Sequence, residues 1–168
     1  MWFWKKVQEV LYENERTDRG DDVLNLTNVF NPLMIRLLRS PLHKIASKNT
    51  LLITFAGNKS GKKYTTPVNY VIDGKVIFIT SLRSRTWWKN LRGGAKIKVH
   101  MQGKDLETNG EVFEDNEKVK EQLMRYLQNV PQYARYFKVN LDHNGHPNPE
   151  DVAQTARDRI MILLRLNN

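Results

Sequence analysis

The 168-residue sequence contains no cysteine. Disulfides, thiol catalysis and thiolate metal sites are therefore excluded, and the absence fits a reducing compartment. No apolar run reaches the roughly 18 residues that a membrane-spanning helix needs. The first residues, MWFWKKVQEV, lack the apolar middle and the small-residue cleavage site of a secretory signal. These absences predict a cytoplasmic protein.

Several catalytic patterns are missing as well. The loop GNKSGK (57–62) is not a P-loop, because three residues instead of four separate its glycines and Lys63 follows Lys62. No nucleophile elbow of the serine hydrolases is present. The histidines are scattered along the chain, so we expect no metal site; they are His43, His100, His143 and His146.

The composition indicates one globular domain with an anionic partner. Hydrophobic residues make up 40% and charged residues 27% of the chain, an ordinary globular balance. The net charge of +9 suggests nucleic acid, a membrane surface or a phosphate-bearing small molecule as the partner. Charge alone leaves open a further explanation, in which the excess lysine only maintains solubility.

Residues 1–48 are expected to be helical and to pack on the remainder of the domain. Trp2–Glu15 has the periodicity of an amphipathic helix, and residues 16–24 are polar and predict a loop. Asn31 and Pro32 are typical of a helix start, as N-cap and first helical residue. Another helical turn or two follow Pro41.

Residues 49–168 are expected to form the β domain. Asp73-Gly74 predicts a hairpin, Asp115 a helix that ends at Pro131, and Asn148-Pro149 another helix start. Because the strands meander, closure into a small antiparallel barrel would remove exposed edges. The strands expected are Thr50–Phe55, Thr65–Ile72, Lys75–Ser81, Ala95–Met101, Asp105–Phe113 and Arg159–Leu166.

The loop from Gly57 to Lys62 is a candidate anion site. Glycines let backbone N–H groups approach an anion closely, and successive N–H groups form an anion-binding nest. Ser60 adds a hydroxyl donor, and Lys59, Lys62 and Lys63 add positive charge. The alternative is a basic hairpin tip without a ligand.

Two further segments carry candidate groups. Arg83 and Arg85 follow a strand directly and precede a tryptophan pair, of which one ring can fill the core while the other lines a pocket. Tyr133 and Tyr136 lie in PQYARYF (131–137), where near-helical spacing is compatible with packing or with a pocket wall.

The block LLITFAGNKSGKKYTTPVNYVIDGKVIFITSLRSRTWWKNL (51–91) resembles the centre of the deazaflavin-dependent nitroreductase family. The resemblance is looser from there to Leu166. It implies a mainly β fold with flanking helices (α+β): a six-stranded antiparallel split β-barrel, FMN-binding-like, spanning residues 49–168 as the cofactor-binding domain. It also implies an oxidoreductase that transfers a hydride from a reduced deazaflavin or flavin to a quinone-like or nitro acceptor.

The resemblance carries the following roles to this sequence. The cofactor is the deazaflavin coenzyme F(420) or FMN. The catalytic positions are Ser81, Tyr133 and Tyr136. The cofactor-binding positions are Gly57, Lys59, Ser60, Gly61, Thr66, Pro67, Val68, Ser81, Arg83, Arg85, Trp87 and Asn90.

The sequence departs from the family pattern at several positions. Asn58 and Tyr64 stand where family members carry basic residues, and we expect Arg83 and Arg85 to compensate. Asn69 and Val130 replace aromatic residues of the substrate pocket, which weighs against nitroimidazole reduction.

Other interpretations belong to different classes. A non-catalytic flavin, deazaflavin or haem carrier could use the same barrel, and a basic nucleic-acid-binding domain would account for the charge, although no regular array interleaves basic and aromatic residues. A homodimer is expected by analogy with split barrels. Trp2, Phe3, Trp4, Lys5 and Lys6 are compatible with a weak contact of the N-terminal helix with the inner face of the membrane, as the alternative to the favoured packing of this helix on the barrel.

Overall fold

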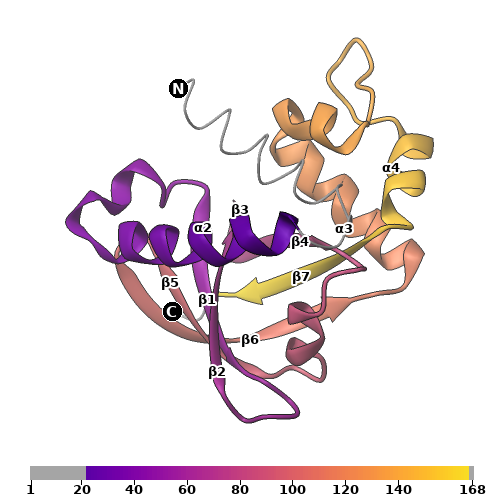
Figure 1. Ribbon diagram of the computed structural model, residues 1–168. Coiled ribbons are helices and arrows are strands. Elements are labelled where there is room, and N and C mark those ends of the chain that lie inside the picture. Colours follow the sequence, from indigo (N-terminus) through magenta and orange to yellow (C-terminus); the bar gives the residue numbers. More distant parts are fainter. Residues whose placement is uncertain (1–21, 167–168) are drawn as a thin grey trace.

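The computed structural model describes residues 22–166, with side chains described from residue 31 onward. In this part of the chain the sheet is flanked by helices, as Figure 1 shows. The elements are α2 (Asp22–Arg39), η1 (Pro41–Ile45), β1 (Thr50–Ala56), β2 (Lys63–Asn69), β3 (Val71–Asp73), β4 (Val76–Leu82), η2 (Trp87–Leu91), β5 (Lys96–Met101), β6 (Lys104–Phe113), α3 (Asn116–Asn129), η3 (Pro131–Phe137), α4 (Pro149–Ala156) and β7 (Arg159–Arg165).

The strands form one curled antiparallel sheet in the order β2-β1-β5-β6-β7-β4-β3. Every pairing is antiparallel, and most join strands that are consecutive in the chain. The mainly β, split-barrel fold class is therefore confirmed. Since β2 begins the order, Pro67 lies on an edge strand, where its missing N–H group is tolerated.

The two faces of the sheet bury different cores. The inner face packs Leu51, Ile53, Ile77 and Ile79 with the indole of Trp88 in η2. On the outer face, Phe78 and Met161 pack against α3, η3 and α4, at the right of Figure 1. A third, smaller cluster fixes α2 against the outer side of β1; it contains Met34, Leu38, Ala46 and Leu52.

The sheet has seven strands where the sequence predicts six, because Thr65–Ile72 divides at Tyr70. The residues before Tyr70 pair with β1, whereas those after it pair with β4. Tyr70 itself is buried, and its hydroxyl donates to the Ser47 carbonyl at 2.9 Å. Burying this ring turns the chain from one strand ladder to the other.

The expected helix start at Asn31 is wrong. α2 already begins at Asp22 and contains Pro32, so Asp22–Leu24 is helical instead of part of a loop. An apolar residue cluster on the sheet outweighs the one backbone hydrogen bond that an interior proline removes. The predicted helix Trp2–Glu15 and the predicted membrane contact of residues 2–6 lie outside the described residues. No described helix is long and apolar enough to cross a membrane.

Candidate functional site

The turn between β1 and β2 is a closed loop; together with Lys63, the first residue of β2, it is called the anion turn (57–63). The N–H of Gly57 donates to the Lys62 carbonyl at 2.8 Å, and the N–H of Gly61 donates to the Gly57 carbonyl at 2.7 Å. Gly61 has a φ of 64°, which favours glycine. At Gly57 an added Cβ would lie 2.8 Å from the Tyr64 ring and 2.9 Å from the Ser60 hydroxyl, so a side chain here would displace one or both of these groups.

Helix η2 holds the anion turn in place. The N–H of Asn58 donates to Asn90 Oδ1 at 2.9 Å, and Asn58 Nδ2 donates to the Lys89 carbonyl at 3.3 Å. Asn90 is in turn fixed by its own bond to the Trp87 carbonyl at 2.9 Å. The structure therefore brings together the predicted residues of two segments that lie about 30 positions apart in the sequence.

Charge and free donors gather on the anion turn. Lys59, Lys62 and Lys63 are exposed, and none of them forms an ion pair with another described residue. The backbone N–H groups of Lys59 and Ser60 likewise donate to no acceptor within residues 22–166. An arrangement of uncommitted ammonium groups and amide donors is suited to bind an anion such as phosphate.

The two departures from the family pattern have structural roles here. Asn58 provides the bonds to η2, and the Tyr64 ring lies 6.1 Å from that of Phe55, whose other neighbour is Trp87 at 6.2 Å between centroids. Trp87 is half-buried, while Trp88 is only 2% exposed. One tryptophan thus fills the core and the other extends the wall beside the turn.

We expect Asn90→Ala to weaken phosphate binding by about fivefold, because the turn loses one hydrogen bond that fixes its shape. Titration with the deazaflavin coenzyme measures the effect. Asn140→Ala is the control, since it removes a similarly exposed asparagine bond, to Asp151 at 2.9 Å, on another part of the surface. Equal affinities in both variants would show that η2 does not organise the turn.

Ser81 lies on β4 in the inner face, on the same side as Ile77 and Ile79. It is 1% exposed, and its Oγ has no hydrogen-bond partner among the described residues. Leaving a buried hydroxyl without a partner costs about 1–3 kcal/mol. Thr80, with the same deficit, points to the opposite face. The Ser81 hydroxyl is therefore a polar group that a ligand entering the barrel could satisfy.

Tyr133 lines a hollow of about 620 Å³ between η1, the β2–β3 junction and η3. Its hydroxyl oxygen accepts a hydrogen bond from Asn49 Nδ2 at 2.8 Å, which leaves the phenolic proton available. Burial, followed by the neighbouring Tyr136, raises the pKa of Tyr133 above its usual 10.0. The other walls of the hollow combine apolar side chains with amides and lysines.

Tyr70, which lines the same hollow, differs from Tyr133 in how its proton is used. Its hydroxyl accepts from Gln102 at 3.0 Å and donates to the Ser47 carbonyl. Sequence patterns gave no indication of Asn49, Gln102 or Tyr70, because none belongs to a motif. Tyr70 lies at the bend between β2 and β3, and its hydroxyl bonds to Ser47 and Gln102 beside the hollow.

The predicted catalytic residues do not share one face. Tyr133 and Tyr136 pack against the outer core around Phe78, with their ring centroids 6.2 Å apart, whereas Ser81 belongs to the inner face. The hydroxyl of Tyr136 accepts from Arg135 at 2.8 Å. Ser81 and the tyrosine pair are therefore two separate groups in this conformation.

Comparison with known proteins identifies the family. A family model described as F420H(2)-dependent quinone reductase matches residues 39–141. The chain belongs to this family. No curated protein sequence matches it.

Several solved structures resemble the chain at low sequence identity. One is a domain-swapped dimer, 17% identical over 80% of this chain and 95% of the other, with a TM-score of 0.49. Another is an F(420)-H2-dependent reductase, 20% identical over 70% and 95%, with a TM-score of 0.44. A third is an FAD-binding protein from Mesorhizobium loti, 11% identical over 82% and 89%, with a TM-score of 0.45.

This member of the F420H(2)-dependent quinone reductase family is a deazaflavin-dependent oxidoreductase. Coenzyme F(420) is the cofactor that the family description names, and FMN stays the alternative that the sequence predicts. Its own residues fit such a group. The uncommitted lysines and amides of the anion turn suit a phosphate, and the partnerless Ser81 hydroxyl is a polar group inside the barrel. The structure brings Lys59, Ser60, Gly61, Trp87 and Asn90 close together, and their contacts with the cofactor stay predictions.

On β2, side chains alternate between the two faces. Thr66 and Val68 are paired with Ile53 and Leu51 and share the inner face, whereas Pro67 is paired with Leu52 and faces α2. All three are half-buried. The sequence predicts that a flavin ring lies along the backbone of these residues, at the edge of β2 that pairs with no other described strand. This position stays a prediction.

Arg83 is bound within the fold of this reductase. Its Nε donates to the Arg157 carbonyl at 2.8 Å, and one terminal nitrogen donates to Asn116 Oδ1 at 2.8 Å. These bonds join β4 to the end of α4 and the start of α3. Its predicted role in phosphate binding would require them to break. Arg85 is half-buried, and its predicted role in phosphate binding stays untested.

We expect Arg83→Ala to lower the free energy of unfolding by about 1–2 kcal/mol, because two hydrogen bonds between elements are lost. Chemical denaturation measures this loss. Cofactor affinity, measured on the folded variant, is expected to stay at the wild-type value. A weaker affinity with unchanged stability would instead make Arg83 a phosphate ligand.

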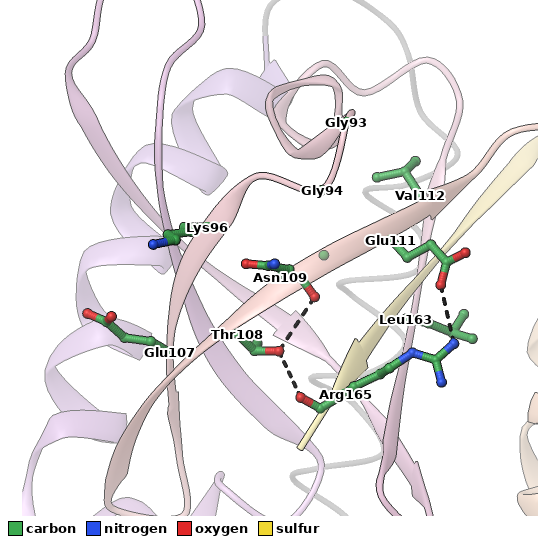
Figure 2. Close-up of a pocket in the computed structure, with 11 residues that line it drawn as sticks. Gly93, Gly94, Lys96, Glu107, Thr108, Asn109, Glu111, Val112, Leu163 and Arg165 are labelled. Carbon is green, nitrogen blue, oxygen red and sulfur yellow. Dashed lines mark hydrogen bonds and ion pairs between the residues drawn. The ribbon is translucent and has the colours of Figure 1, made fainter. Parts of the chain in front are cut away.

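A second hollow, of about 670 Å³, lies over β6 and is shown in Figure 2. Most of its charged groups form ion pairs: Arg165 pairs with Glu111 at 3.6 Å, and Glu107 pairs at 3.1 Å with Lys98, which lies outside the hollow. The Thr108 hydroxyl donates to the Arg165 carbonyl at 2.8 Å. None of the predicted site residues lines it, so we do not assign it to the cofactor.

Proposed function

We propose that this protein reduces a quinone-like acceptor, held in the Tyr133 hollow, with the cofactor anchored at the anion turn. The observation that carries the proposal is the anion turn itself, which presents three ammonium groups without ion pairs and two free amide donors within the described structure. A fixed backbone with amide donors and positive charge left over is the arrangement that an anion-binding turn requires. Family membership supplies the reaction class.

The residues of the turn would bind and orient the cofactor phosphate. The cofactor, when bound, supplies the hydride. Lys59 and the amides of Lys59 and Ser60 contribute charge-assisted hydrogen bonds, and Trp87 limits access of water to the side of the turn. Ser81 would donate its unused hydroxyl proton to an acceptor atom inside the barrel.

Tyr133 would hydrogen-bond a carbonyl oxygen of the acceptor. A quinone becomes a hydroquinone by gaining one hydride and one proton. The phenol proton of Tyr133 is free to be donated, since Asn49 occupies only the oxygen lone pair, and the raised pKa keeps it in place at neutral pH. Water would then restore the proton. A nitro acceptor is less suited, since Asn69 and Val130 provide no aromatic wall for it.

The decisive experiment is titration of the purified protein with coenzyme F(420) and with FMN, followed by anaerobic mixing of the reduced complex with a short-chain quinone. We expect tight binding of one cofactor and its oxidation on mixing. Binding without turnover would favour the cofactor carrier, and no binding of either cofactor would remove the proposal. A homodimer and a cytoplasmic location stay predictions.

A further inference from the structure

The positive charge of the chain is concentrated in one stretch. Residues 23–72 contain seven lysines and arginines and no aspartate or glutamate. The rest of the chain holds twenty basic and eighteen acidic residues, so it is nearly balanced. Three of the seven basic residues belong to the anion turn. The other four are Arg36, Arg39, Lys44 and Lys48, on α2 and around η1, and the proposed function gives them no role.

Large apolar side chains are exposed on the same segment. Leu42 is 62% and Ile45 is 52% exposed, and on β3 Ile72 is 39% exposed. Leu42 and Ile45 stand three residues apart in a 3₁₀ helix, so their side chains lie on one side of it. Earlier on α2, Leu33 is 64% exposed and is followed one turn later by Arg36.

Some of these basic and apolar residues lie at the Tyr133 hollow. Lys44, Ile45, Lys48 and Ile72 all line that hollow as well as being exposed. Lys44 and Lys48 form no ion pair with any residue in the described range. We call the surface made by Leu42, Lys44, Ile45, Lys48 and Ile72 the η1 face.

We propose that the η1 face docks on an anionic lipid bilayer, so that the Tyr133 hollow opens toward the membrane interface. Leu42, Ile45 and Ile72 would enter the boundary between head groups and acyl chains, while Lys44 and Lys48 bind lipid phosphates. This contact is separate from the N-terminal segment. The docking itself is independent of the proposed function, whereas entry of a lipid-borne acceptor rests on it.

Two other partners of the η1 face are disfavoured: a second copy of the chain by charge, and a nucleic acid by the exposed apolar side chains. A second copy of the chain docked in a two-fold dimer on this face would bring two copies of Lys44 and Lys48 into one interface, and the hollow that they line contributes no carboxylate to balance them. A nucleic acid would satisfy the lysines but leave Leu42, Ile45 and Ile72 without a partner, since none of the residues of the η1 face is an aromatic ring for base stacking. An anionic bilayer satisfies both kinds of group.

Vesicle flotation of the full chain without cofactor tests the docking. We expect binding to vesicles that contain phosphatidylglycerol and little binding to pure phosphatidylcholine. Lys44→Glu/Lys48→Glu should weaken binding by about tenfold or more, since each basic residue near the surface contributes about 1 kcal/mol. Lys96→Glu/Lys118→Glu, the same charge change at exposed sites on β5 and α3, should stay within about threefold of the wild type.

The apolar part of the η1 face has its own variant. Leu42→Ser should reduce flotation, whereas Leu141→Ser, at a leucine 40% exposed in the loop after η3, should not. Circular dichroism confirms that each variant is folded. Equal losses in both lysine pairs would attribute binding to net charge and overturn the proposal, as would equal binding to both vesicle types or a dimer that Leu42→Ser dissociates.

A second measurement separates docking from the proposed function. With reduced cofactor present, a long-tailed quinone in phosphatidylglycerol vesicles should be reduced faster than one in phosphatidylcholine vesicles, and Leu42→Ser should abolish the difference. Vesicle binding without any turnover would preserve the docking and remove the proposed function. Turnover that is equal in both kinds of vesicle would show that the hollow does not open toward the membrane.

Discussion

Replacing Lys59, Lys62 and Lys63 together by alanine should raise the dissociation constant for coenzyme F(420) by about a hundredfold. The three ammonium groups are exposed and solvated, so each contributes at most about 1 kcal/mol to binding a phosphate. Each of the three losses should nevertheless weaken binding, because no described carboxylate forms an ion pair with these lysines. Fluorescence titration of the cofactor measures the change.

Two comparisons show whether the lost affinity belongs to the phosphate. Wild-type affinity should fall with added salt, and the triple variant should depend on salt much less, because screened charges have been removed. A deazaflavin that lacks the phosphate tail should bind both proteins equally. Replacing Lys96, Lys104 and Lys118 by alanine removes the same charge from exposed sites elsewhere. If this control loses as much affinity, the anion turn is not the phosphate site.

The sequence predicts the anion turn well because its information is local. Gly57 has close contacts with neighbouring side chains, and Gly61 has a positive φ. Both features involve only residues of the turn and its immediate neighbours in the sequence. The alternation of side chains along the strands and the N-caps at Asp115 and Asn148 also depend on neighbouring residues only. The structure confirms both N-caps. Only the single strand expected over Thr65–Ile72 divides, since its bend depends on where the Tyr70 ring is buried.

The surroundings of Tyr133 could not be predicted in the same way. Asn49 contacts Tyr133 across 84 positions, and Gln102 contacts Tyr70 across 32. Neither amide lies in a pattern that distinguishes it from an ordinary surface residue. The bonds of Arg83 also join residues far apart in the sequence, at the start of α3 and the end of α4. An arginine that the sequence predicts to bind phosphate is therefore held within the fold. Long-range contacts of single polar groups leave no periodicity to detect.

Tyr133→Phe should lower the turnover of a quinone by about a hundredfold or more while cofactor affinity stays at the wild-type value. The ring and its packing remain, and only the proton donor disappears, along with the acceptor for Asn49. Single-turnover oxidation of the reduced complex measures the rate. A solvent deuterium isotope effect on that rate should be present in the wild type and reduced in the variant.

Tyr136→Phe is the matched control, because Tyr136 is not among the residues that line the Tyr133 hollow, and loss of its hydroxyl should reduce turnover by no more than about threefold. Asn49→Ala should give an intermediate loss, since the phenol keeps its proton but loses the bond that orients it. Equal losses in all three variants would indicate a general disturbance of η3, which thermal melting would reveal. Full turnover in Tyr133→Phe would assign proton donation to another group.

The pH dependence gives an independent test of Tyr133. Burial raises its pKa above the usual 10.0, so the phenol is protonated and competent throughout the neutral range. Turnover should therefore be constant there and fall only as the pH rises through this raised pKa. In Tyr133→Phe the residual rate should lack that alkaline decline. A wild-type rate that declines near neutral pH would mean that a different acid controls the step, since desolvation of a phenol moves its titration upward and never downward.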